Sequence, residues 1–236
     1  MMLRYLLFLV YLLPFGSVLA QAGFSWGVSL FPNYSDRRLI AFEYITQEDI
    51  FKLDSIESGR LSYAGGVFAH WRSEKVGFQA GVNLMNTGYR TIRSLILPDD
   101  PDQSLGSERR FVYRNLNIEV PLELHFFQEV SPGNEFIFIL GTAISYNMAN
   151  DTYKLIYADG APKRSNVTDE EQVFRTTNMA FVTAIGWEHS LSDQLSLVIQ
   201  PTFEFWMRGI LDNADLNRNL YNIGVKVNLK FKRQYE

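Results

Sequence analysis

Acidic and basic side chains recur on one face of the predicted strands in this 236-residue chain, and they are the first candidates for chemistry. The set comprises Glu119, Glu123, Glu188, Glu204, Arg208, Lys226 and Lys230. Such a set could form a polar track or a ligand site, but buried charges also pair simply to offset one another. If the hairpin between the last two strands folds symmetrically near Ala214, Glu204 comes within diagonal reach of Lys226. We predict a charge-balanced network with a structural role.

The three histidines, His70, His125 and His189, are the remaining candidates for catalysis or metal binding. His189 precedes Ser190, and some outer-membrane enzymes that modify lipid A use a serine and a histidine. Neighbouring residues on a strand point apart, however, and no carboxylate is placed to orient the imidazole. The chain has no cysteine, which excludes disulfides, thiol catalysis and cysteine-ligated metals. We therefore predict no catalytic residue, no cofactor and no metal site, with a lipid-modifying enzyme as an alternative.

The N-terminus has the pattern of a secretory signal. Arg4 precedes the apolar run Tyr5–Leu13, and Ser17–Ala20 supplies the small residues of a cleavage site. The run is shorter than the roughly 20 residues that a spanning helix needs. We predict a cleaved signal peptide over residues 1–20 and one exported domain over residues 21–236.

The rest of the chain alternates apolar and polar residues with a period of two, which predicts β-strands. Eight strands are expected, at Phe24–Phe31, Leu61–Trp71, Val76–Tyr89, Phe111–Phe127, Phe136–Asn147, Asn178–His189, Leu195–Arg208 and Leu220–Phe231. Pro121 and Pro201 fall inside two of them and predict a bulge or kink, because proline cannot donate to the ladder.

The connections between these strands alternate in length. Pro32–Arg60, Arg90–Arg110, Met148–Thr177 and Gly209–Asn219 are long, whereas Arg72–Lys75, Gln128–Glu135 and Ser190–Gln194 are short. Transmembrane barrels have short periplasmic turns and long extracellular loops. The pattern therefore predicts an all-β fold, an eight-stranded antiparallel up-and-down transmembrane β-barrel in the bacterial outer membrane. A mean hydropathy of −0.09 suits such a barrel, since its two strand faces average out.

The composition of the two faces indicates which one meets lipid. The apolar faces carry aromatic residues near the strand ends, at Trp71, Tyr89, Phe126, Trp187, Phe203, Phe205, Tyr221 and Phe231. The opposite faces are rich in glycine, serine, asparagine and alanine, with few of the lysines and glutamates of a water-facing sheet. This favours apolar faces turned outward, with aromatic girdles at both interfaces. A soluble, lipocalin-like carrier of a small ligand, with its apolar faces inside, is the alternative.

Charge and loop composition limit the partners. A net charge of −4 argues against nucleic acid as a partner. The long loops carry acidic clusters at Asp99–Asp102 and Asp169–Glu171, which suit solvated loops, calcium-bridged lipopolysaccharide or a protein partner. We predict a monomeric barrel that contacts outer-membrane lipid and lipopolysaccharide, with an envelope or secretion-complex protein as a further partner.

Three segments resemble the PorT-like outer-membrane β-barrel family. They are Gly23–Val28, Gly77–Asn83 and, most clearly, Leu116–Leu122, in which Glu119 and Pro121 stand as in the family's fourth strand. Gly141–Ala143 resembles the glycine-containing strand that follows. The resemblance implies an outer-membrane barrel, and the family's namesake takes part in protein secretion across the outer membrane. Only location and fold are carried over from the resemblance. From the residues, we predict a structural or partner-binding role without chemistry of its own.

Overall fold

The computed structural model describes residues 23–41, 45–158, 160–167, 173–212 and 216–232. The predicted signal peptide and the acidic cluster Asp169–Glu171 lie outside these residues. The elements are β1 (Gly23–Ala41), α2 (Gln47–Ile56), β2 (Glu57–Ser73), β3 (Val76–Thr91), β4 (Ser94–Leu95), η1 (Gln103–Leu105), β5 (Glu108–Ser131), β6 (Asn134–Tyr157), β7 (Lys163–Val167), β8 (Thr177–Ser190), β9 (Leu195–Trp206) and β10 (Leu216–Lys232).

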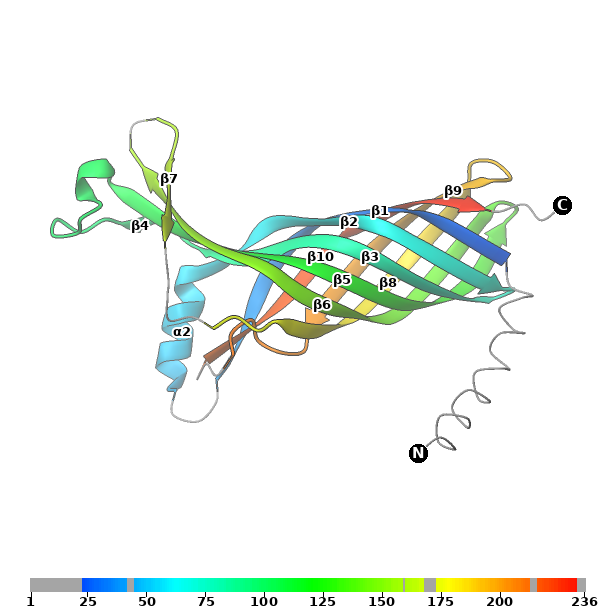
Figure 1. Ribbon diagram of the computed structural model, residues 1–236, viewed down its shortest axis with the longest axis horizontal. Coiled ribbons are helices and arrows are strands. Elements are labelled where there is room, and N and C mark those ends of the chain that lie inside the picture. The colour runs from blue at the N-terminus through cyan, green and yellow to red at the C-terminus, as the bar shows by residue number, and fades with distance from the viewer. Residues whose placement is uncertain (1–22, 42–44, 159, 168–172, 213–215, 233–236) are drawn as a thin grey trace, which may run out of the picture.

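Eight of these strands close into an antiparallel barrel, which confirms the predicted fold (Figure 1). The ring runs β1-β2-β3-β5-β6-β8-β9-β10, and β10 returns to β1 with Ser25 opposite Lys232. Each predicted strand lies within or overlaps one strand of this ring. Closure leaves no free edge in the wall, so the backbone groups of neighbouring strands can pair all the way round.

The loops alternate in length as predicted, but several strands are longer than expected. Only Glu74 and Lys75 separate β2 from β3, and only Pro132 and Gly133 separate β5 from β6. The first predicted loop is shorter than expected, because β1 continues past Phe31 to Ala41 and α2 follows. β5 and β6 also extend beyond the barrel, where β4 pairs with β5 and β7 pairs with β6. We call β4, β7, the outer ends of β5 and β6 and the adjoining loop residues the extracellular extension, which projects to the left in Figure 1.

The interior of the barrel is filled with side chains. Near the short turns, Phe127, Ile137, Ile139, Ala184 and Val198 form an apolar cluster. Towards the long loops, a second cluster comprises Phe31, Ala64, Met85, Tyr89, Ala143, Ala180, Val182, Trp206, Ile210 and Leu220. Tyr89 was predicted on the outer face but is buried and stacks on Tyr113 at 4.5 Å between ring centroids. Side chains at even-numbered positions of β3, such as Val82 and Leu84, point outward. Tyr89 has an odd number, so its side chain points into the lumen.

Of the bulge or kink predicted at Pro121 and Pro201, the bulge is wrong, because both prolines interrupt the ladder without moving its register. Between β8 and β9, the pairs Ala184–Thr202 and Trp187–Ile199 share one register, and no pair is formed between them. Pro201 pairs normally with β10, through Val225. A proline has no N–H to donate to one of its two neighbouring strands, so pairing is lost with that neighbour only.

Candidate functional site

The centre of the lumen holds an ion pair that joins opposite walls. Lys226 of β10 donates to Glu123 of β5 at 2.7 Å, and both side chains are almost completely buried. Gln79 and His125 each bond the other oxygen of Glu123, at 3.1 Å. A buried carboxylate is tolerated only when its lone pairs are satisfied in this way.

The predicted contact between Glu204 and Lys226 is wrong. The β9–β10 register sets Lys226 opposite Gln200 and Glu204 opposite Asn222, too far apart along the hairpin. Glu204 instead accepts a hydrogen bond from the Trp206 indole at 2.9 Å, while Lys226 bonds Glu123 of β5. The pairing therefore runs across the lumen and not along the hairpin.

A second buried ion pair lies at the periplasmic end, where Lys230 donates to Glu188. His70 and His125 lie above it with ring centroids 5.2 Å apart, and Ser25 is 3.3 Å from the Nδ1 atom of His70. The structure thus buries six of the seven residues predicted for the network: Glu119, Glu123, Glu188, Glu204, Lys226 and Lys230.

Arg208 is the exception. β9 ends at Trp206, and the Arg208 side chain is exposed outside the lumen. Its backbone bonds the side chain of Asn178 through both its N–H and its carbonyl group. The alternation that predicted an inward position stops at the end of the strand.

The two candidate catalytic side chains have different partners. His189 bonds Asn134 at 2.8 Å through its Nδ1 atom, while the hydroxyl of Ser190 accepts a hydrogen bond from Lys232 at 3.2 Å. Both lie at the periplasmic end of β8, beside the short turns. Among the described residues, no group of three or more histidine, aspartate or glutamate residues is placed to hold a metal ion.

An arginine–glutamate cluster closes the extracellular end of the lumen, and the sequence reasoning missed it. Glu57 accepts from Arg37 at 2.9 Å and from Arg218 at 2.7 Å, and Arg37 also pairs with Asp54 at 3.0 Å. Arg37 and Glu57 lay inside a segment predicted to be a loop. The sequence does contain a signal for Arg37, because polar residues recur at alternate positions of β1 beyond the predicted end of the strand. The inward face of β1 carries Ser25, Asn33, Ser35 and Arg37.

At the periplasmic rim, Arg72 forks onto Glu135 with two hydrogen bonds of 2.5 Å. These bonds hold the pKa of the Glu135 carboxyl below its usual range. A lowered folded-state pKa stabilises the protein above the unfolded pKa, and this contribution disappears as the pH falls through the folded value. We expect Glu135→Gln to lose about 1 kcal/mol of unfolding free energy at pH 7, a modest figure because the pair is partly exposed.

The same substitution should make no difference in acid, where Glu135 is protonated in both states. Urea titrations of the barrel in lipid vesicles, followed by tryptophan fluorescence at several pH values, measure this. Glu129→Gln, an exposed carboxylate of the same turn region, is the matched control. A loss for Glu135→Gln that persists at low pH would contradict the role of the ion pair.

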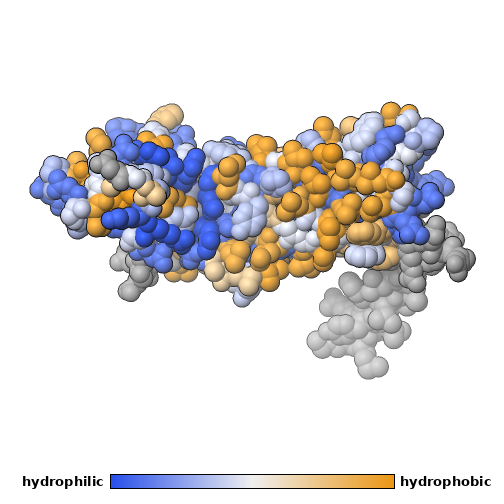
Figure 2. All heavy atoms as spheres, turned by 90° about the horizontal axis from the view of Figure 1, so that it is seen from above, coloured by the Kyte–Doolittle hydropathy of each residue, from blue (hydrophilic) through white to orange (hydrophobic). Residues whose placement is uncertain are grey.

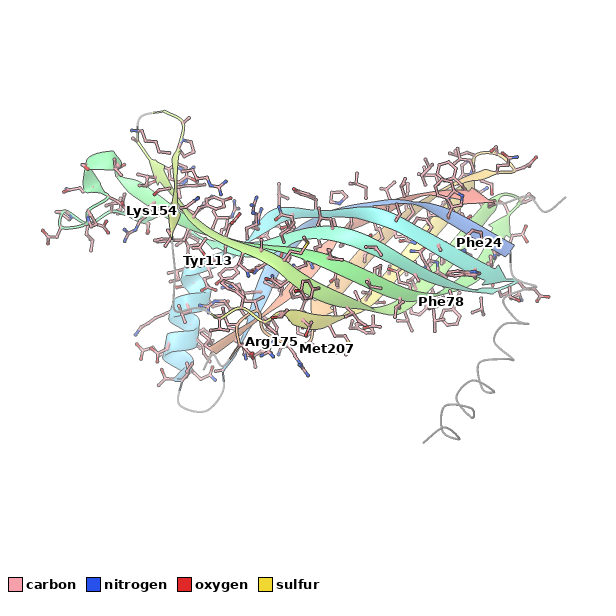
Figure 3. The ribbon with its side chains drawn as sticks, viewed as in Figure 1. Phe24, Phe78, Tyr113, Lys154, Arg175 and Met207 are labelled. Carbon is pink, nitrogen blue, oxygen red and sulfur yellow. The ribbon has the colours of Figure 1, made fainter. Side chains whose placement is uncertain are left out.

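The outer wall carries a continuous apolar belt. Outward residues at mid-height include Leu30, Val67, Val82, Ile144, Ile185 and Ile223, each about half exposed. Figure 2 shows hydrophobic residues gathered over the barrel on the face in view, with hydrophilic residues at both ends. Aromatic contacts follow the periplasmic edge, where Trp71 lies between Phe24 and Phe78 and Trp26 stacks on Phe231. Phe24 and Phe78 mark this edge in Figure 3, and Met207 lies towards the other end.

A closed ring of eight strands with an apolar belt and an aromatic periplasmic edge is suited to lipid and not to water. The protein is an outer-membrane β-barrel. The lipocalin-like alternative is wrong, because it requires the apolar faces to line the lumen, where the charged network lies.

No protein-family model and no curated protein matches the sequence. Among solved structures, the chain is similar to Neisserial surface protein A, at 9% identity over 89% of this chain and 96% of the other, with a TM-score of 0.43. It is also similar to the outer membrane protein OprG of Pseudomonas aeruginosa, at 9% identity over 91% and 98%, with a TM-score of 0.48. The outer membrane protease OmpT of Escherichia coli matches at 7% identity over 89% and 97%, with a TM-score of 0.43.

None of the helices in the described part of the chain combines the length and hydrophobicity that a membrane span requires.

Proposed function

We propose that this protein is a non-conducting outer-membrane barrel that presents its extracellular extension to a protein partner, without chemistry of its own. The observation that carries the proposal is the continuous pairing of β5 with β6, from Ser131–Asn134 at the periplasmic turn to Glu108–Tyr157 at the tip. The barrel wall therefore continues as a sheet into the medium. The projecting part of this sheet does not line the lumen. It therefore suits the binding of a protein partner better than the transport of a solute.

The tip of the extension exposes an apolar surface. Ile92, Leu95, Leu97 and Leu105 are exposed in the segment between β3 and β5, and Leu95 and Leu97 are each at least 70% exposed. Asp102 fixes the underlying loop, because it is buried and bonds Lys154 at 2.5 Å and 2.7 Å. Exposed leucines on an ordered, water-facing surface are typical of protein contacts. We call these four residues the apolar tip.

The filled lumen supports the non-conducting part of the proposal. An eight-stranded barrel is only wide enough for side chains, and here two apolar clusters lie on either side of the Lys226–Glu123 pair. A hydrated ion would have to displace these groups. The positions of His189 and Ser190 at the periplasmic end, with different partners, favour a role without catalysis over lipid A modification in the outer leaflet.

The resemblance to the PorT-like family suggests which partner to seek first. A protein of the secretion machinery or of another envelope complex would meet the apolar tip on the outer surface of the cell. We propose a monomeric barrel that acts as an accessory to such a complex.

Site-specific photo-crosslinking in intact cells tests this function. A photoreactive residue at Leu97 should give one discrete protein adduct, whereas the same probe at Val67 in the belt should react with lipid alone. Leu95→Glu combined with Leu105→Glu should abolish the adduct at Leu97 while leaving heat-modifiable gel migration unchanged. Absence of a protein adduct at Leu97, or ion conductance by the purified barrel in planar bilayers, would overturn the proposal.

A further inference from the structure

A groove lies on the outer wall at the extracellular edge of the belt, away from the apolar tip. It has a volume of about 470 Å³, between α2 and the wall formed by β1, β9 and β10. Its lining combines apolar and aromatic side chains with two arginines and one carboxylate, and it comprises Arg37, Arg38, Leu39, Ile50, Asp54, Phe203, Phe205 and Tyr221.

A second hollow of about 320 Å³ lies below the groove, in the lipid-facing wall itself. Pro201, Phe203, Ile223 and Gly224 line it, together with residues of β8. The hollow lies where Pro201 leaves a gap in the β8–β9 ladder. Phe203 lines both hollows, so they adjoin at this side chain, and we call the two together the track.

The charges at the upper end of the track are paired, with the exception of Arg38. Arg37 is held by Asp36, Asp54 and Glu57, and Tyr221 donates to Asp36 at 3.3 Å. Arg38 is exposed, and no carboxylate in the described part of the chain pairs with it. The track therefore combines an apolar lower end in the belt with an upper end where the Arg38 guanidinium forms no ion pair with a described residue.

We infer that this track binds a phosphorylated lipid of the outer leaflet, with an acyl chain against Phe203 and Ile223 and a phosphate on Arg38. Lipid is the medium around the belt, so the lower hollow is filled by acyl chains. A guanidinium can bond a phosphate with two parallel N–H groups, which gives a geometric preference over a neutral headgroup. This site differs from the acidic loops that were predicted to contact lipopolysaccharide through calcium, and it does not depend on the proposed partner at the apolar tip.

Native mass spectrometry of the full-length protein in mild detergent tests the inference, with purified diphosphorylated lipid A as the probe. We expect the wild-type barrel to retain one lipid, and we expect Arg38→Gln to lower its affinity about tenfold, the effect of losing one charge-assisted contact. Ile223→Trp, which fills the lower hollow, should reduce retention of the same lipid by displacing its chain. Lipid A from which both phosphates have been removed should bind wild type and Arg38→Gln equally weakly.

Two matched variants control for general effects. Arg164→Gln removes an exposed arginine of β7, and Val67→Trp enlarges a belt residue on β2, away from the track. Both should retain lipid A like the wild type, and all variants should keep heat-modifiable migration as evidence of folding. The inference would be overturned if Arg38→Gln and wild type retained diphosphorylated lipid A equally, or if the wild type bound the dephosphorylated lipid as tightly as the diphosphorylated one.

Discussion

The Lys226→Met variant is expected to lose about 3 to 5 kcal/mol of unfolding free energy. Lys226 bonds Glu123 at 2.7 Å in the centre of the lumen, and the Glu123 side chain is 1% exposed. Without the lysine, the carboxylate stays buried with only Gln79 and His125 as partners. Methionine occupies a volume close to that of the lysine stem, so the loss reports on charge and not on packing. Urea titration of the barrel in lipid vesicles, followed by tryptophan fluorescence, measures it.

A double variant separates the pair from its surroundings. Glu123→Gln with Lys226→Met removes both charges and should recover most of the lost free energy, since replacing a buried ion pair by neutral residues is often nearly neutral. The exposed pair Glu48–Lys52 on α2, at 2.9 Å, provides the control: Lys52→Met should change stability by less than about 0.5 kcal/mol. If the single and double variants lose the same amount, the carboxylate does not depend on Lys226.

The second large effect is expected on the outer face. Val82 is 51% exposed and lies in the middle of the belt on β3. An arginine at the mid-plane of a barrel wall costs about 2 to 4 kcal/mol, because its charge must leave water for hydrocarbon. We therefore expect Val82→Arg to lose this amount in vesicles and to assemble poorly in cells.

Leu97→Arg is the matched control, because Leu97 is 70% exposed but lies in water on the extracellular extension. It should change the unfolding free energy by less than about 0.5 kcal/mol. The comparison of Val82→Arg with Leu97→Arg therefore distinguishes exposure to lipid from exposure to water. Equal tolerance of arginine at both positions would contradict a lipid-facing belt at Val82.

The positions of the strands could be predicted from the sequence because each face of a membrane-spanning strand has a single environment. Leu116 to Phe126 alternates strictly, since one side of β5 meets lipid and the other meets the polar lumen. Where the outer face of a strand passes from lipid into water, the alternation of apolar and polar residues ends and no longer indicates a strand. β1 beyond Phe31 leaves the belt, so its outer face becomes polar, and Arg37 was assigned to a loop for that reason.

The pairing of charges could not be predicted in the same way. Alternation indicates that Glu123 and Lys226 face the lumen, but it contains no information about which residues meet across it. The contact depends on the height of each residue in the barrel, which is set by the tilt of the strands and their register. Lys226 therefore reaches β5 across the lumen, whereas reasoning limited to one hairpin placed it beside Glu204.

The unbroken β5–β6 pair also sets a distance. The pair leaves the belt near Leu116, where a shift in register bends it, and continues to Glu108 at the tip. At about 3.3 Å per residue, the tip stands at most roughly 30 Å above the rim. Backbone hydrogen bonds hold this height, so the extension works as a spacer and not as a tether. A partner docked there would be kept at a fixed elevation among the sugars of the outer leaflet, and its size and reach must match that elevation.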